Sequence, residues 1–315
     1  MASSTSLPQL NGGLFLTDGG LETDMIFNHG FDLPAFAAHT MLATPEGEAA
    51  LRLYFLKFLR LAREQGTGFI LDCPTWRAQG AYASELGVEE TELWRINRDA
   101  VEFARDLRAR QALFLDIVVN GLIGPCGDAY AAEQRLTAAQ AEDYHSQQVR
   151  WLADAGVDMV SAMTFGTADE AIGVARAAKK RDVPVVISFT VETDGCLPSG
   201  QRLGDAIVQV DRATAEAPAY YMVNCAHPDH FSDVLDGPDW THRVRGVRCN
   251  ASRASHAELD EAETLDDGNP AEFGELTAAL IRKLPWLNVF GGCCGSDLRH
   301  IAAVVRAVRP LQMTA

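Results

Sequence analysis

Asn288-Val289-Phe290-Gly291-Gly292-Cys293-Cys294-Gly295-Ser296 predicts a buried strand that ends in a sharp turn and leads directly into a helix. Neighbouring side chains of a regular strand point to opposite faces, so two adjacent cysteines on a strand could not serve one site. The glycines supply the backbone freedom to turn both sulfurs the same way. Ser296 is a preferred helix N-cap. Two thiolates at such a turn suit either a soft metal site or a redox pair.

Similar strand-then-helix units precede this junction. The earlier strands are predicted at 14–18, 67–72, 113–120, 157–163, 183–189, 219–224 and 244–250. The helices are predicted at 46–64, 89–110, 138–154, 168–181, 204–214, 230–236, 273–283 and 297–308. Near-continuous apolar runs with Val and Ile indicate strands covered on both faces. Eight such units predict an α/β fold, a single-domain (β/α)8 TIM barrel.

An open, doubly wound sheet is the main alternative to the barrel. It is disfavoured because no glycine-rich dinucleotide fingerprint follows the first strand. We expect residues 1–12 to form a disordered N-terminal tail and residues 13–315 to form the barrel domain. The apolar face of helix 46–64 packs on the barrel and would also allow a homo-oligomer.

Composition excludes several classes of function. The chain has 315 residues, 47% of them hydrophobic, which is enough for a large core. Its net charge of −16 argues against nucleic acid and anionic membrane surfaces as partners. No apolar run approaches the roughly 18 residues of a membrane span, and the start does not resemble a signal peptide. Seven cysteines, an odd number, indicate reduced thiols in a cytoplasmic protein.

In a barrel, the chemistry lies at the carboxyl ends of the strands. Cys225 follows the sixth predicted strand and Cys293 and Cys294 follow the eighth, so three thiols would converge on one rim. Three thiolates with one open position are typical of catalytic Zn²⁺. A substrate thiol in that position would lose its proton and remain nucleophilic. The alternative for Cys225 is a small core residue; His227, two residues later, is expected to pack at the rim.

The same residues resemble the homocysteine S-methyltransferase family over about residues 14–308. The resemblance rests mainly on Thr17-Asp18-Gly19-Gly20-Leu21-Glu22-Thr23, Val223-Asn224-Cys225 and Gly291-Gly292-Cys293-Cys294-Gly295. It implies that Cys225, Cys293 and Cys294 hold zinc and act in catalysis through it. It also implies methyl transfer from a sulfonium or ammonium donor, such as S-methylmethionine, S-adenosylmethionine or betaine, to homocysteine in methionine biosynthesis. The expected substrate-binding residues are Asp18, Gly19, Gly20, Leu21, Glu22, Met163 and Asn224.

Met163 departs from the family pattern, because many members carry a glutamate there that is expected to bind the substrate ammonium. Either another carboxylate, Glu22 or Glu192, takes the ammonium, or the acceptor is a different small thiol whose acid binds Arg77. A barrel redox protein with a Cys293–Cys294 disulfide is an alternative from another class. A zinc-binding barrel without catalysis is a third.

Overall fold

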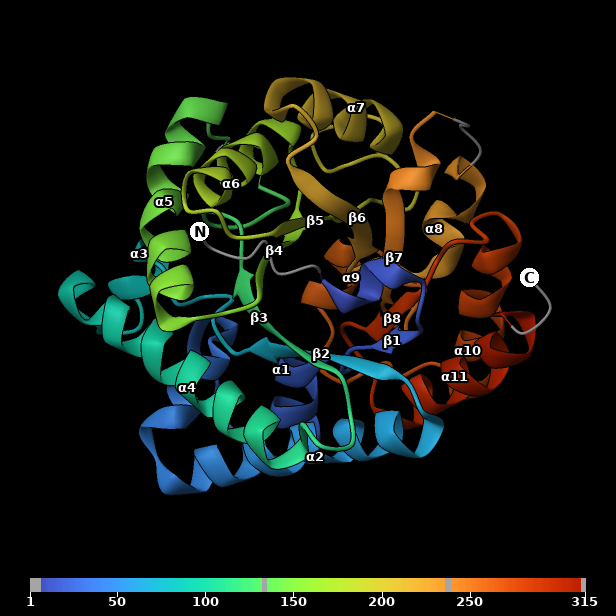
Figure 1. Cartoon of the computed structure of the whole chain (residues 1–315), viewed down its shortest axis with the longest axis horizontal. Coiled ribbons are helices and arrows are strands. Elements are labelled where there is room, and N and C mark those ends of the chain that lie inside the picture. The colour runs from blue at the N-terminus through green and yellow to red at the C-terminus, as the bar shows by residue number, and fades with distance from the viewer. Residues whose placement is uncertain (1–6, 132–134, 236–238, 313–315) are drawn as a thin grey trace.

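Eight parallel strands close into one barrel, in the order in which they occur in the chain (Figure 1). The computed structural model describes residues 7–131, 135–235 and 239–312. Parallel pairing of the first strand with both the second and the eighth closes the barrel and excludes the open-sheet alternative. The strands are β1 Phe15–Leu16, β2 Gly68–Cys73, β3 Ile117–Ile123, β4 Met159–Phe165, β5 Val185–Phe189, β6 Pro218–Asn224, β7 Val244–Cys249 and β8 Val289–Gly292.

Helices surround the strands in Figure 1. The longer ones are α2 Pro45–Gln65, α4 Leu93–Gln111, α5 Ala138–Ala155, α6 Ala168–Lys180, α7 Leu203–Thr214, α10 Pro270–Ala279 and α11 Leu298–Gln312. Short helices lie in the connecting segments: α1 Leu21–Thr23, α3 Gly80–Ala83, α8 Pro228–Phe231 and α9 His256–Asp260.

Local sequence signals fix several helix ends. Thr137 and Gln140 form a reciprocal capping box at the start of α5, and Gly156 ends that helix with a left-handed φ of 88°. Thr44 caps α2, whose first residue is a proline, and Gly66 ends it at φ 60°. The predicted fold therefore follows from signals within each strand–helix unit.

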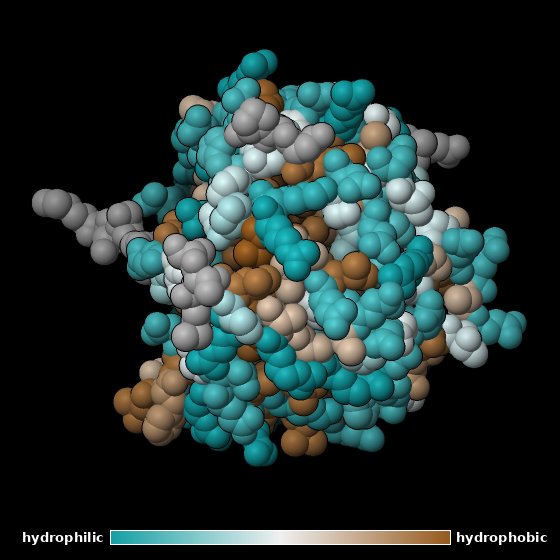
Figure 2. Space-filling view, turned by 90° about the vertical axis from the view of Figure 1, so that its right-hand side faces the viewer, coloured by the Kyte–Doolittle hydropathy of each residue, from teal (hydrophilic) through white to brown (hydrophobic). Residues whose placement is uncertain are grey.

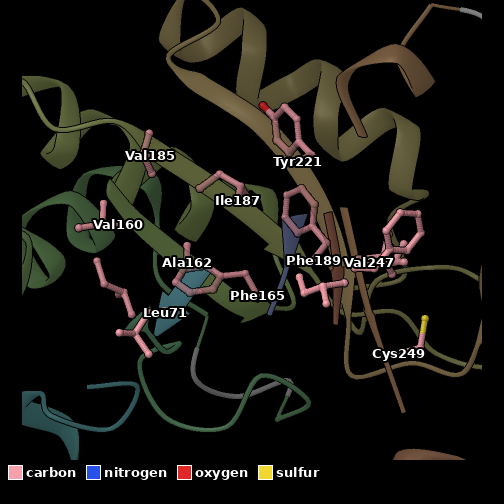
Figure 3. Packing of buried hydrophobic residues seen from close by; sticks show 14 of the residues in the cluster. Leu71, Val160, Ala162, Phe165, Val185, Ile187, Phe189, Tyr221, Val247 and Cys249 are labelled. Carbon is pink, nitrogen blue, oxygen red and sulfur yellow. The ribbon is translucent and has the colours of Figure 1, made fainter. Parts of the chain in front are cut away.

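Strand residues alternate between two environments. Outward side chains such as Ile187, Phe189 and Tyr221 pack against the helices (Figure 3), and the Phe189 and Tyr221 rings stack with centroids 6.2 Å apart. Inward side chains near the strand starts form a separate apolar cluster: Phe15, Ile70, Val118, Met159, Val186, Tyr220, Met222 and Val289. Above it the inward positions become polar: Asp72, Asn120, Ser161, Ser188, Asn224 and Arg248. The barrel interior thus changes from apolar to charged towards the rim that carries the cysteines.

Three predictions about the elements were wrong. Residues 7–12, assigned to the disordered tail, are ordered: Pro8–Asn11 form a 3-10 helix, and Gln9 is fully buried and donates to Tyr220 Oη at 3.2 Å. Leu7 joins the apolar cluster, so this segment covers the lower end of the barrel. Residues 1–6 lie outside the described residues.

The third strand begins four residues later than the predicted 113–120. Leu113 is 92% exposed in a turn, so apolar composition alone misplaced the start. Asn120 consequently lies within β3 and faces the barrel interior instead of ending the strand. The helix expected at 230–236 is instead α8 followed by a 3-10 turn, Ser232–Val234; position 236 lies outside the described residues.

The face shown in Figure 2 is mostly hydrophilic, with apolar side chains gathered near its middle. Within residues 7–131, 135–235 and 239–312, the helices lack the length and apolar composition needed to span a membrane.

Candidate metal centre and substrate cavity

Cys225, Cys293 and Cys294 meet at the carboxyl end of the barrel. Their three sulfur atoms lie within 4.8 Å of one another, and the Sγ atoms of Cys225 and Cys294 are 3.9 Å apart. Zn–S bonds of about 2.3 Å in a tetrahedron separate sulfurs by about 3.8 Å, so the spacing fits this donor set. Hydrogen bonds from the other two thiols, with Arg248 nearby, hold the pKa of the Cys293 thiol well below its usual value. In the described part of the chain, no other cluster of His, Cys, Asp or Glu meets this spacing.

Strand β7 lies between the two cysteine-bearing strands and sets their spacing, although it provides no sulfur to the cluster. The Cys225 amide donates to the Arg248 carbonyl at 3.1 Å, and the Cys293 amide donates to the Cys249 carbonyl at 2.8 Å. Cys225 itself has a left-handed φ of 56°, which turns its side chain off the regular strand alternation. Gly295, at φ 77°, makes the corresponding turn after Cys294.

The Asp18-Gly19-Gly20 segment packs directly on the cysteine turn. The Gly292 amide donates to the Asp18 carbonyl, and the Gly20 amide donates to the Ser296 carbonyl, each at 2.9 Å. A Cβ on Gly20 would lie 2.5 Å from the Cys293 carbonyl oxygen, and one on Gly19 would lie 2.6 Å from that of Ser296. These glycines therefore allow two backbone segments, far apart in sequence, to touch beneath the sulfurs.

A buried ionic network lies under the cysteines. Arg248 pairs with Asp18 at 2.5 Å and with Asp72, and its Nε donates to the Gly292 carbonyl at 3.2 Å. Asp72 in turn accepts from Asn120 at 2.7 Å. Burial raises the pKa of Asp18 to about 7; Arg248 opposes this rise and Asp72 adds to it. The single Arg248 guanidinium therefore balances only one of the two negative charges when both carboxylates are ionised.

Asn224 connects the end of β6 to neighbouring strands. Its Oδ1 accepts from the Thr164 amide at 2.9 Å and from Ser188 Oγ at 2.6 Å, while its Nδ2 donates to Thr164 Oγ1 at 2.7 Å. Nδ2 also lies 4.0 Å from Cys293 Sγ. Asn224 therefore holds the strand ends beside the sulfurs.

A cavity of about 440 Å³ opens above the three sulfurs. All the expected substrate-binding residues line it: Asp18, Gly19, Gly20, Leu21, Glu22, Met163 and Asn224. Arg77 also lines it, whereas Glu192 does not. His227 is buried, and its Nδ1 caps α8 by accepting from the Asp229 amide, in agreement with the predicted packing role.

Sequence reasoning missed two groups at the site. Arg248 was read only as part of a strand, although a charged residue in a strand buried on both faces signals an interior ion pair. Tyr130, from the β3–α5 segment, reaches the cavity, where its hydroxyl lies 2.6 Å from Thr190 Oγ1 and its ring stacks on His256 at 3.5 Å. Nothing in the local sequence marked Tyr130, because only the folded loops bring it there.

Comparison with known proteins gives a consistent result. A family model described as homocysteine S-methyltransferase matches residues 15–308. Homocysteine S-methyltransferase 3 of Arabidopsis thaliana is 23% identical over 94% of this chain and 90% of its own length. A methionine synthase of Mycobacterium leprae is 25% identical over 67% of this chain, a match that spans 18% of that larger protein.

Solved structures of the Escherichia coli homocysteine methyltransferase MmuM share the fold. The metallated form superposes with a TM-score of 0.71 at 19% identity, over 96% of both chains. The oxidised form gives the same TM-score at 20% identity, over 93% of this chain and 95% of that one.

Proposed function

Because the chain belongs to the homocysteine S-methyltransferase family, we propose that it transfers a methyl group from a sulfonium or ammonium donor to the thiol of homocysteine, giving methionine, with zinc as cofactor. The observation that carries the proposal is the meeting of Cys225, Cys293 and Cys294 at one end of the barrel, below a cavity. Three thiolate donors suit zinc and leave one position for a ligand.

Bound zinc would hold the acceptor sulfur as a thiolate, so the protein needs no general base for this proton. The reaction is a displacement in which the donor's bond to the methyl group breaks as the new S–CH₃ bond forms. The donor leaves as a neutral sulfide or amine. The task of the chain is then to place the two reactants in line inside the cavity.

The cavity wall suits a positively charged donor. Trp76, Tyr130, Phe27 and Phe36 line it, and aromatic faces attract onium cations. Trp76 is fixed by a 3.1 Å hydrogen bond from its indole nitrogen to the Met163 carbonyl. The aromatic residues favour a methyl-onium donor but do not distinguish S-methylmethionine, S-adenosylmethionine and betaine.

A second candidate reaction differs in the thiol that accepts the methyl group. Met163 faces the cavity and cannot pair with an ammonium, so a thiol without an α-amino group is the alternative acceptor. Of the two carboxylates considered as substitutes, Glu22 lines the cavity and Glu192 does not, which favours homocysteine held by Glu22. If Met163→Glu sharply improved homocysteine turnover, the alternative acceptor would be favoured instead.

The direct test is a methyl-transfer assay with the zinc-loaded protein, homocysteine and each donor class. Formation of methionine at a rate that Cys225→Ser abolishes is the expected result. Zinc binding without transfer to any thiol would indicate a binding protein. Protein that holds no zinc when purified reduced, and transfers no methyl group, would indicate the redox alternative. A cytoplasmic location and a role in methionine biosynthesis are parts of the same proposal.

A further inference from the structure

Two oppositely charged side chains face the cavity without forming an ion pair. Glu22 lies on α1, and Arg77 lies in the segment between β2 and α3; both line the cavity above the sulfurs. Among the described residues, neither forms an ion pair, although each lies near enough to the other for their charges to interact. Unpaired charges in a partly enclosed cavity are costly unless a ligand completes them.

Arg77 is held rigidly by neutral groups. Its guanidinium lies 3.8 Å from the Trp76 ring centroid and 4.3 Å from that of Tyr82, and Nη1 donates to the Gly127 carbonyl at 3.1 Å. Its Nε has no hydrogen-bond partner among the described residues. Burial lowers the pKa of the Arg77 guanidinium, and nearby Tyr82, Glu22 and Asp128 oppose this shift without cancelling it. A fixed, planar guanidinium that forms no ion pair is suited to a carboxylate ligand.

Glu22 is the carboxylate available to a cation. The other acidic residues on the cavity wall are engaged: Asp18 and Asp72 with Arg248, Asp128 with the Tyr130 amide, Asp260 with His256 and Asp266 with Ser252. No side chain or backbone group of another described residue bonds Glu22. Glu22 lines the same cavity as Cys293 and Cys294, and burial raises the pKa of its carboxyl to about 7.

We propose that Glu22 and Arg77 form a clamp for the two charges of an α-amino acid, with Glu22 binding the ammonium and Arg77 the carboxylate. This inference rests on the proposed function, since the amino acid is the one whose thiol reaches Cys225, Cys293 and Cys294. Glu22 replaces the carboxylate that Met163 cannot supply. Arg77 adds a carboxylate contact on the β2 side of the cavity. Together they make the acceptor an α-amino acid thiol rather than a simple thiol or thiol acid.

The test removes one charge at a time from the ligand and from the protein. Wild-type, zinc-loaded protein is titrated calorimetrically, without donor, with homocysteine, with 4-mercaptobutyrate, which lacks the ammonium, and with 3-aminopropanethiol, which lacks the carboxylate. Each truncated thiol should bind about 10- to 100-fold more weakly than homocysteine, the range for a lost charge-assisted hydrogen bond. This arm needs no variant and therefore does not depend on a variant's folding.

The variants should show complementary selectivity. Glu22→Gln should weaken the binding of homocysteine and of 3-aminopropanethiol by that factor and leave the binding of 4-mercaptobutyrate unchanged. Arg77→Gln should weaken the binding of homocysteine and of 4-mercaptobutyrate and leave that of 3-aminopropanethiol unchanged. Glu192→Gln and Arg150→Gln, which do not line the cavity, are matched controls expected to bind all three thiols as the wild type does. Equal losses for all three thiols, or no loss, would overturn the clamp.

Methionine separates failure of the clamp from failure of the proposed function. It carries both charges but no thiol, so the clamp should bind it more tightly than 4-(methylthio)butyrate even in zinc-free protein. Methionine binding of this kind without any methyl transfer would leave the clamp standing and refute the proposed reaction. Methyl transfer to 4-mercaptobutyrate as efficient as to homocysteine would support the reaction and refute the clamp.

Discussion

Replacing Arg248 with methionine tests the buried network beneath the cysteines. The side chain is 9% exposed, and it carries the positive charge that faces Asp18 and Asp72. Methionine fills much of the same space but leaves both carboxylates without a cation. Removing one partner of a buried ion pair typically costs about 3–5 kcal/mol. That is a large part of the roughly 5–15 kcal/mol by which proteins of this kind are stable.

The free energy of unfolding is measured by urea titration, followed by circular dichroism, at pH 8 and pH 5.5. Because burial raises the pKa of Asp18 to about 7, this carboxyl is ionised at pH 8 and largely protonated at pH 5.5. The loss caused by Arg248→Met should therefore be larger at pH 8. Arg60→Met, which breaks an exposed pair with Glu64, is the control and should leave stability unchanged within error.

Two further results complete this prediction. Adding Asp18→Asn and Asp72→Asn to Arg248→Met removes the uncompensated charges and should restore part of the lost stability. A loss of stability below about 1 kcal/mol at pH 8, or one that does not change with pH, would contradict a buried charge pairing between Arg248 and the two carboxylates.

Four other predictions concern packing and titration. Gly20→Ala should lower the free energy of unfolding by about 1–3 kcal/mol and weaken zinc binding, since the new Cβ would lie 2.5 Å from the Cys293 carbonyl oxygen. Gly13→Ala is the control: its Cβ would meet only Phe15, at 3.8 Å, so both measurements should be unchanged. Leu7→Ala should cost about 2–4 kcal/mol in urea unfolding, because this side chain is buried in the lower barrel cluster; no change would mean that the segment does not pack there. Homocysteine binding should tighten as pH rises through 7, where Glu22 becomes ionised, and Glu22→Gln should retain only the part of this profile that comes from thiol ionisation. Because of the same raised pKa, the free energy of unfolding should fall as the pH rises from about 4.5 to 7. Over this range the folded protein keeps a proton on Glu22 that the unfolded chain has lost.

Much of the fold could be predicted because each strand–helix unit carries its own signals. Apolar runs of Val and Ile predicted β4 to β7 to within about two residues at most ends, and the longer helices followed from periodicity and caps. β3 was misplaced because Leu113 and Phe114 are apolar but exposed, and apolar composition does not distinguish a turn from a strand end. The segment 7–12 was missed because its few buried residues form no repeating pattern.

The three-sulfur cluster could be predicted because Cys225 and the Gly-Gly-Cys-Cys-Gly turn at 291–295 each follow a strand, and a barrel brings the strand ends to one rim. The charge pattern of the interior could not. Arg248 meets its partners across 176 and 230 residues, so the pairing follows from barrel closure and not from local sequence. The same holds for the cavity: only the folded loops show that Glu22 faces it and Glu192 does not.

The measurement that bears most directly on the central claim is zinc content with chelator competition, in wild type, Cys225→Ser and Cys73→Ser. Cys73 is buried and outside the three-sulfur cluster, so its variant is the matched control. We expect about one tightly held zinc ion per chain in wild type and in Cys73→Ser, and a loss of affinity of at least about tenfold in Cys225→Ser. Equal zinc affinity in Cys225→Ser and wild type, or no zinc in any of them, would contradict the account.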